Sequence, residues 1–213
     1  MGSKMLTGSM LVFGPILAII MLFVEPGGME DEAAFSVIVQ SLLDNSTLGE
    51  IAAVGWPIAL LATTIGTAYL ARSMQGEHKI GSDLAGLASV LAFLSAGIVA
   101  VSTGLAMVVF SSSWAGQGGD AANAVAISEA LGRGMMMFMG AAILLLGIAI
   151  FRQKNLNRIA GGITGLFGAL LFGGWIIPGS IEVFGFIGFI GFVGWPIMTI
   201  VLGILTIRQA RSE

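Results

Sequence analysis

Six long apolar stretches, separated by short polar ones, make up most of this 213-residue chain. Each is close to the ~20 residues that an α-helix needs to cross a hydrocarbon layer of ~30 Å. Asp, Glu, Lys, Arg and His are absent from all six stretches. The pattern predicts an all-α integral membrane protein in which residues 1–213 form a single transmembrane domain. The six predicted spans lie near residues 5–24, 51–71, 84–110, 134–151, 159–178 and 188–207.

Composition agrees with the membrane assignment and excludes several kinds of chemistry. Hydrophobic residues make up 56% of the chain and charged residues 10%, against roughly 25% charged in a soluble domain. Cysteine is absent, which removes disulfides, thiolate catalysis and cysteine-ligated metals. Zincin, Walker A and dinucleotide-binding motifs are absent as well. We therefore expect no cofactor and no nucleic-acid partner, and whether the protein is an enzyme stays open.

The basic residues predict how the chain sits in the cell membrane. Eight of the nine Lys and Arg precede span 1, follow span 6 or lie between spans 2 and 3 or 4 and 5. Only Arg133 belongs to the opposite side. The positive-inside rule then places both termini in the cytoplasm. Nine of the twelve acidic residues fall on the other side, so the outer face is expected to be strongly anionic.

A sequence repeat predicts how the spans are organised. The stretch VGWPI occurs at residues 54–58 and again at 193–197, and the same register aligns Thr67 with Thr206. Span 2 therefore resembles span 6. Spans 1 and 5, which precede them, both end in a Pro-Gly turn, EPGG and IPGS. We interpret the chain as an up-down bundle of three helical hairpins, each of about 70 residues.

Both VGWPI copies carry a Trp-Pro pair, Trp56-Pro57 and Trp195-Pro196. The indole rings are expected in a belt at the outer interface, together with those of the other two tryptophans. Each proline removes a helical N–H and predicts a kink just below that belt. The GFIGFIGFVG stretch before Trp195 is expected to be a flexible, aromatic-rich entrance to its helix.

Three charged residues form a candidate polar cluster on the outer face. Glu129 and Arg133 are four residues apart, so on a helix they share one face and can pair. A looser alignment of the hairpins places Glu50 at the position of Arg133. One interpretation is an ion pair that fixes the register of the helices, and the other is a ligand site.

Hydroxyl groups within the spans are candidates for a polar path. Thr63 and Thr67 share a face of span 2, and Ser95 and Ser102 share a face of span 3. They could line a route for a neutral solute, or bond back to the carbonyl one turn earlier and satisfy themselves.

A methionine cluster precedes the middle of span 4. Thioethers suit Cu(I), which makes Met135, Met136 and Met139 candidate ligands. Methionine also fills irregular gaps in packing, and that is the alternative interpretation.

Span 5 carries a strip of small residues at intervals of four: Gly161, Gly165, Ala169 and Gly173. Helices can approach closely along such a strip. Its partner is expected to be another span of this chain, or else span 5 of a second copy.

Three functions remain compatible with these features. The first is an accessory or scaffold subunit that packs with other membrane proteins or with itself in the lipid bilayer. The alternative is a channel or facilitator for a small neutral or cationic solute, and the third is a membrane-embedded, lipid-active enzyme that uses the outer acids. A continuous polar cavity would favour transport, whereas a dry core would favour the subunit.

Overall fold

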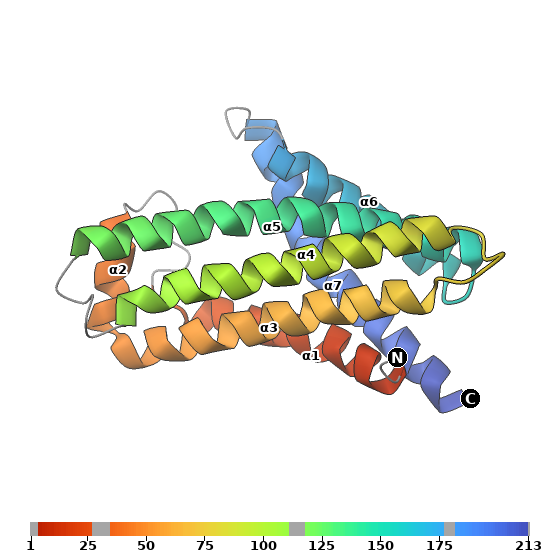
Figure 1. Ribbon diagram of the computed structural model, residues 1–213, viewed down its shortest axis with the longest axis horizontal. Coiled ribbons are helices and arrows are strands. Elements are labelled where there is room, and N and C mark those ends of the chain that lie inside the picture. Colours follow the sequence, from red (N-terminus) through yellow and green to blue (C-terminus); the bar gives the residue numbers. More distant parts are fainter. Residues whose placement is uncertain (1–3, 27–34, 111–117, 177–181, 213) are drawn as a thin grey trace.

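A computed structural model describes residues 4–26, 35–110, 118–176 and 182–212. All regular secondary structure in these ranges is helical, and six of the helices are long and apolar enough to cross a membrane (Figure 1). Both findings confirm the prediction from sequence. The six helices are α1 (Lys4–Val24), α3 (Ser46–Ser73), α4 (Ser82–Ala106), α5 (Gly118–Gln153), α6 (Arg158–Ile176) and α7 (Glu182–Ser212). Two shorter elements are the helix α2 (Phe35–Asp44) and the 3₁₀ turn η1 (Met107–Phe110).

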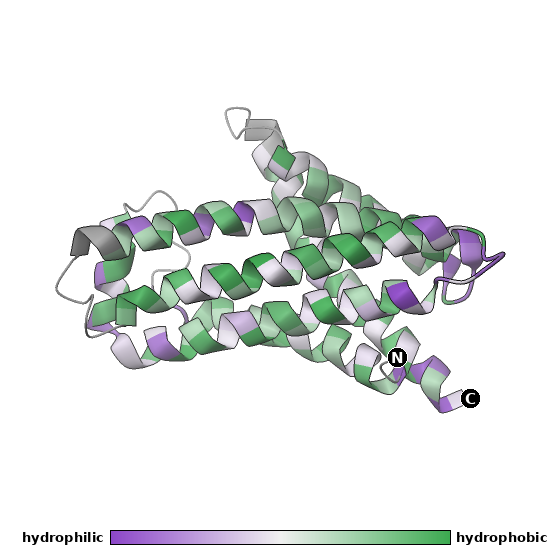
Figure 2. Ribbon diagram, viewed as in Figure 1, coloured by the Kyte–Doolittle hydropathy of each residue, from purple (hydrophilic) through white to green (hydrophobic). Residues whose placement is uncertain are grey.

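Each long helix packs on its neighbours in sequence, and α7 returns to pack on α1. Helices α3, α4 and α5 lie side by side in one layer, while α6 and α7 run obliquely to it (Figure 1). Both chain termini lie at one end of the molecule, which we call the terminal end. The short helix α2 lies at the opposite end, which we call the α2 end. Hydropathy follows the same axis, with the strongly polar residues concentrated near the ends of the helices (Figure 2).

Helices α5 and α6 approach each other closely because glycines remove the side chains between them. A β-carbon added to Gly147 would meet the backbone of Gly165, and one added to Gly161 would meet the backbone of Phe151. Such close approach gives van der Waals contact that lipid cannot match. Half of the predicted small-residue strip, Gly161 and Gly165, thus faces α5 of the same chain. The other half does not, because Ala169 is exposed and a β-carbon on Gly173 would meet open space.

The GFIGFIGFVG stretch is part of the continuous helix α7 and packs on α6. Three of its glycines, Gly188, Gly191 and Gly194, face Gly174, Leu171 and Phe167 of α6 in turn. Steps of three residues turn by 300° on a helix, so the glycines drift around α7. Because α6 and α7 cross, the contact line follows that drift. The stretch is therefore helical and packed against α6, and its expected flexibility stays a prediction.

The middle of the bundle is filled by one apolar cluster, which we call the central cluster. Its buried members are Ala68, Ala92, Val99, Met135, Met139, Ala142, Ile143, Leu171 and Trp195. Trp195 is 4% exposed, so the expected place in an interfacial belt is wrong for this residue. The reason is that the packing of α7 on α6 and the neighbouring helices turns the indole inward. Trp114, another expected member of the belt, lies outside the described residues.

Candidate functional site

A cavity of about 280 Å³ opens at the α2 end of the bundle. It is enclosed by the end of α1, by α2, η1 and α4, and by the facing turns of α3 and α5. The cap over this region is a second apolar cluster, in which Val39 of α2 packs with Val109, Ala121 and Val125. The helix α5 can contribute to both features because its 36 residues extend well beyond a single crossing. The α2 cap therefore encloses a pocket that the six long helices by themselves would leave open.

The cavity contains a carboxyl group that is held by an indole ring. Glu25 directly follows α1, and its Oε2 accepts a hydrogen bond of 2.7 Å from Nε1 of Trp56 on α3. Burial raises the pKa of the Glu25 carboxyl above its ordinary value. The hydrogen bond from Trp56 lowers that pKa, whereas the nearby charge of Glu129 raises it further. Protonation of the Glu25 carboxyl, or a cation bound beside it, would therefore relieve an electrostatic penalty.

Three hydroxyl groups line the same cavity, and each donates its hydrogen to the backbone. Ser102 and Thr103 donate to the carbonyl oxygen of Val99, at 3.1 and 2.7 Å. Ser128 of α5 donates across to the carbonyl oxygen of Ser102, at 3.1 Å. The hydroxyl oxygens still have free lone pairs, so they can accept a hydrogen bond from a ligand.

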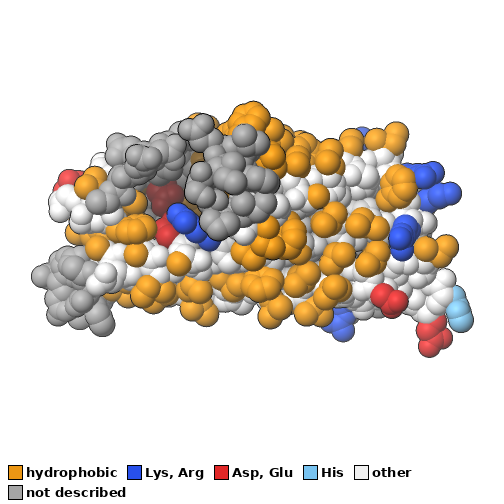
Figure 3. Space-filling view, turned by 90° about the horizontal axis from the view of Figure 1, so that it is seen from above, with side chains coloured by type: hydrophobic (Ala, Val, Ile, Leu, Met, Phe, Trp, Pro, Cys, Tyr) orange, Lys and Arg blue, Asp and Glu red, His pale blue; other side chains and the backbone are white. Residues whose placement is uncertain are grey.

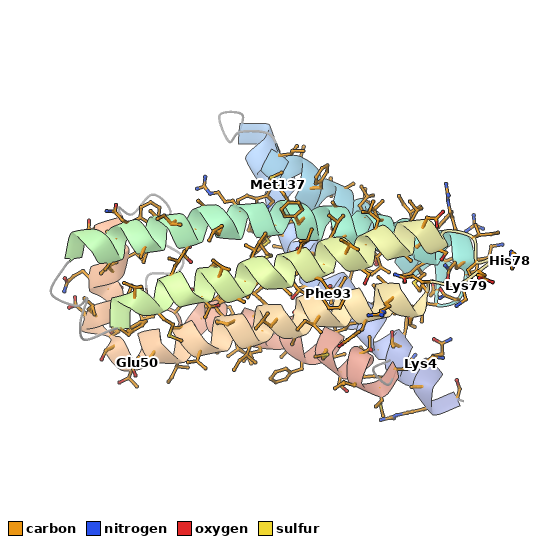
Figure 4. All side chains as sticks on the ribbon, viewed as in Figure 1. Lys4, Glu50, His78, Lys79, Phe93 and Met137 are labelled. Carbon is orange, nitrogen blue, oxygen red and sulfur yellow. The ribbon has the colours of Figure 1, made fainter. Side chains whose placement is uncertain are left out.

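The predicted polar cluster does not come together. Glu129 and Arg133 are both exposed, and Glu129 lines the cavity whereas Arg133, one turn further along α5, does not. Glu50 is exposed on α3 and points away from the bundle (Figure 4). Among the described residues, no ion pair joins Arg133 to either acid within 4.0 Å. Glu129 instead lines the same cavity as Glu25, and its charge raises the pKa of the Glu25 carboxyl.

Sequence reasoning treated Glu25 as one of several outer acids and did not single it out. A signal was present in the repeat, because EPGG after span 1 corresponds to IPGS after span 5. An apolar residue thus occupies the matching position, Ile177, and marks the acid as a departure from the repeat.

The hydroxyl groups of the predicted path form hydrogen bonds within their own helices. Thr63 donates to Ala59 at 2.8 Å, and Thr67 donates to Thr63 at the same distance. Ser95 donates to Leu91 at 3.0 Å. Of the four predicted residues, Ser102 alone lines the cavity.

The methionines and the Trp-Pro pairs have mixed placements. Met135 and Met139 are buried in the central cluster, and Met136 packs against it. Trp56 and Pro57 line the cavity. Trp195, by contrast, lies in the core, where its indole nitrogen has no hydrogen-bond partner. Pro57 and Pro196 both lie inside helices assigned as continuous.

Comparison with models of protein families, with curated proteins and with solved structures found no match to this chain. In the described part of the chain, no three His, Cys, Asp or Glu side chains are grouped to hold a metal ion.

Proposed function

We propose that the protein is a non-conducting interaction subunit of the membrane. The observation that supports this function is the closed interior below the cavity. The cavity ends at Leu60, Val99 and Gly132, and the central cluster begins at the same level. Below the cavity, the hydroxyls of Thr63, Thr67 and Ser95 are donated within their own helices. The buried hydroxyl of Thr164 on α6 has no hydrogen-bond partner, so it stands apart from the others and does not join them into a chain of sites for a solute. A third apolar cluster, which includes Leu11, Leu70 and Met74, continues from there toward the terminal end.

A function of this kind needs a surface for a partner, and a groove on α4 and α5 is suited to one. The groove is apolar, has a volume of about 620 Å³ and is lined by Phe93, Gly97, Val101 and Leu131 among others. A β-carbon on Gly97 would meet nothing within 4 Å. A transmembrane helix of another protein could therefore approach closely at this point.

We further propose that the terminal end is cytoplasmic and that the bundle is a threefold hairpin repeat. Most of the Lys and Arg side chains visible in Figure 3 lie toward one end of the molecule, while apolar side chains cover its middle. The repeat is supported by matching contacts. A β-carbon on Gly55 would meet Met21 of the preceding span, and one on the equivalent Gly194 would meet Phe167 of its preceding span. Two of the three hairpins thus share a close approach at the same glycine of the repeat, although the residues that it faces are not equivalent.

The absence of conduction is tested by reconstitution into sealed liposomes. Entry of glycerol, urea and methylammonium, followed by stopped-flow light scattering, is expected to match that of protein-free liposomes. The reason is that desolvating a polar solute in an apolar core carries a free-energy penalty of several kcal/mol. Protein-dependent entry of any of the three solutes would replace this proposal with a facilitator.

The interaction surface is tested by photo-crosslinking in native membranes. A photoreactive residue at Val101, in the groove, is expected to give a discrete adduct with a second membrane protein. The control position is Phe13 of α1, which is also exposed but lies outside the groove. Equal adduct patterns from the two positions would contradict a specific surface.

A further inference from the structure

We propose that the cavity at the α2 end binds a small organic ammonium ion, a primary amine with a short apolar body. This inference is independent of the interaction function proposed above. It rests on the size of the cavity, on its two carboxyl groups and on the direction in which every lining donor points.

The donors of the described lining residues are all used within the protein. The indole N–H of Trp56 is donated to Glu25. The hydroxyls of Ser102, Thr103 and Ser128 are donated to backbone carbonyl oxygens. With Glu25 and Glu129 ionised, the polar lining offers acceptors alone. A ligand that binds here must therefore bring its own donors.

The charge of the lining selects a cation. Its described residues include two carboxyl groups and no Lys, Arg or His. A cation that donates to a carboxylate forms a charge-assisted hydrogen bond, which is shorter and stronger than a neutral one. Anions are repelled by the same charges, and acceptor-only solutes find no free side-chain donor in the described lining. A primary ammonium has three N–H donors, which suits the several acceptors better than a quaternary ammonium does.

The volume and the apolar part of the lining select an organic cation over a bare metal ion. About 280 Å³ corresponds to roughly nine water volumes at ~30 Å³ each. A single ion would leave most of that space unfilled. Ile38, Leu42, Leu60 and Phe110 form apolar walls around the acceptors. They would bury a hydrocarbon body of about the size of the phenylethyl group of 2-phenylethylamine.

Glu25 also fits a ligand site better than a structural one. A glutamine at this position could accept the Trp56 hydrogen bond through its amide oxygen without a buried charge. The chain instead carries an acid whose ionised form is disfavoured by burial. A perturbed acid at the wall of a cleft is typical of a functional site.

The test uses the full-length protein in lipid nanodiscs and isothermal titration calorimetry. We expect 2-phenylethylamine to bind at least about tenfold more tightly than 2-phenylethanol, which has the same body and no charge. E25Q and E129Q are each expected to weaken amine binding at least about tenfold. E50Q removes an acid from the same end of the molecule but outside the cavity, and is expected to change the affinity less than about twofold.

A second pair of variants tests the place of binding without changing charge. Gly132 lines the cavity and Gly134 does not, and a β-carbon on either would meet nothing within 4 Å. G132L should fill the cavity and abolish amine binding, whereas G134L should leave it intact. The proposal is overturned by equal affinity for amine and alcohol, by no amine binding up to about 10 mM, by equal loss in E50Q and E25Q, or by equal effects of the two leucine variants.

Discussion

Glu25 shows how one residue can link stability to pH. Its pKa is raised in the folded protein, so the folded state keeps a proton that the unfolded chain has already lost. The contribution of Glu25 to stability is therefore fully present below the ordinary value of 4.5 and is lost as the pH rises through the raised folded pKa. The described groups that act on this carboxyl are the indole of Trp56, which lowers its pKa, and Glu129, which raises it.

The E25Q variant is expected to lose that pH dependence and to be more stable than the natural protein at pH 8. Its amide keeps an oxygen for the Trp56 N–H and adds no buried charge. The measurement is the thermal unfolding midpoint in detergent between pH 4 and pH 8, with E50Q as the exposed control. A natural protein and E25Q that respond identically to pH would contradict the burial of this carboxyl.

Contacts between single residues that are distant in the sequence could not be predicted from it. The sequence places Glu25 in an outer loop, and no local pattern brings it to Trp56, which lies 31 residues away. Their contact depends on where α1 ends relative to α3. For Arg133 and Glu129 the local spacing was correct, yet the guanidinium is exposed and unpaired with that acid in the described part of the chain. Helical spacing permits such a pair but does not decide whether the arginine uses it.

At the scale of elements, the glycines of α5 and α6 fix how closely these helices pack. The G147A variant would place a methyl group against the backbone of Gly165, which cannot move aside as a side chain would. We expect it to destabilise the protein by about 1–3 kcal/mol through overpacking. G173A is the matched control, since its methyl group meets open space and alanine favours the helix by up to ~1 kcal/mol.

Reversible unfolding in mixed micelles, or loss of protease resistance on heating, measures both variants. A G147A protein as stable as G173A would show that the two helices do not meet at Gly147. The prediction of a close-packed strip from the sequence was therefore useful but incomplete. The spacing by four identified Gly161 and Gly165, while the crossing of α5 and α6 left Ala169 and Gly173 outside the contact.

At the scale of the whole molecule, the orientation proposed for the bundle can be tested directly. The chain contains no cysteine, so single cysteines can be introduced without a background. Glu77, near the terminal end, and Ser46, near the α2 end, are both exposed. A membrane-impermeant maleimide applied to intact cells should label S46C and should label E77C after lysis alone. The reverse pattern would show that the positive-inside rule fails for this protein.

The sequence by itself predicted a lipid environment for this protein and its six long apolar helices. Both follow from local quantities, because a stretch of about 20 apolar residues must hide its backbone polar groups in a helix wherever lipid surrounds it. Tertiary structure decided the rest. The placement of Trp195 in the core, the seam between α6 and α7, and the cavity between Glu25 and Glu129 all depend on how helices cross and where they end. Crossing angles arise from packing between distant segments, and no periodicity within one segment specifies them.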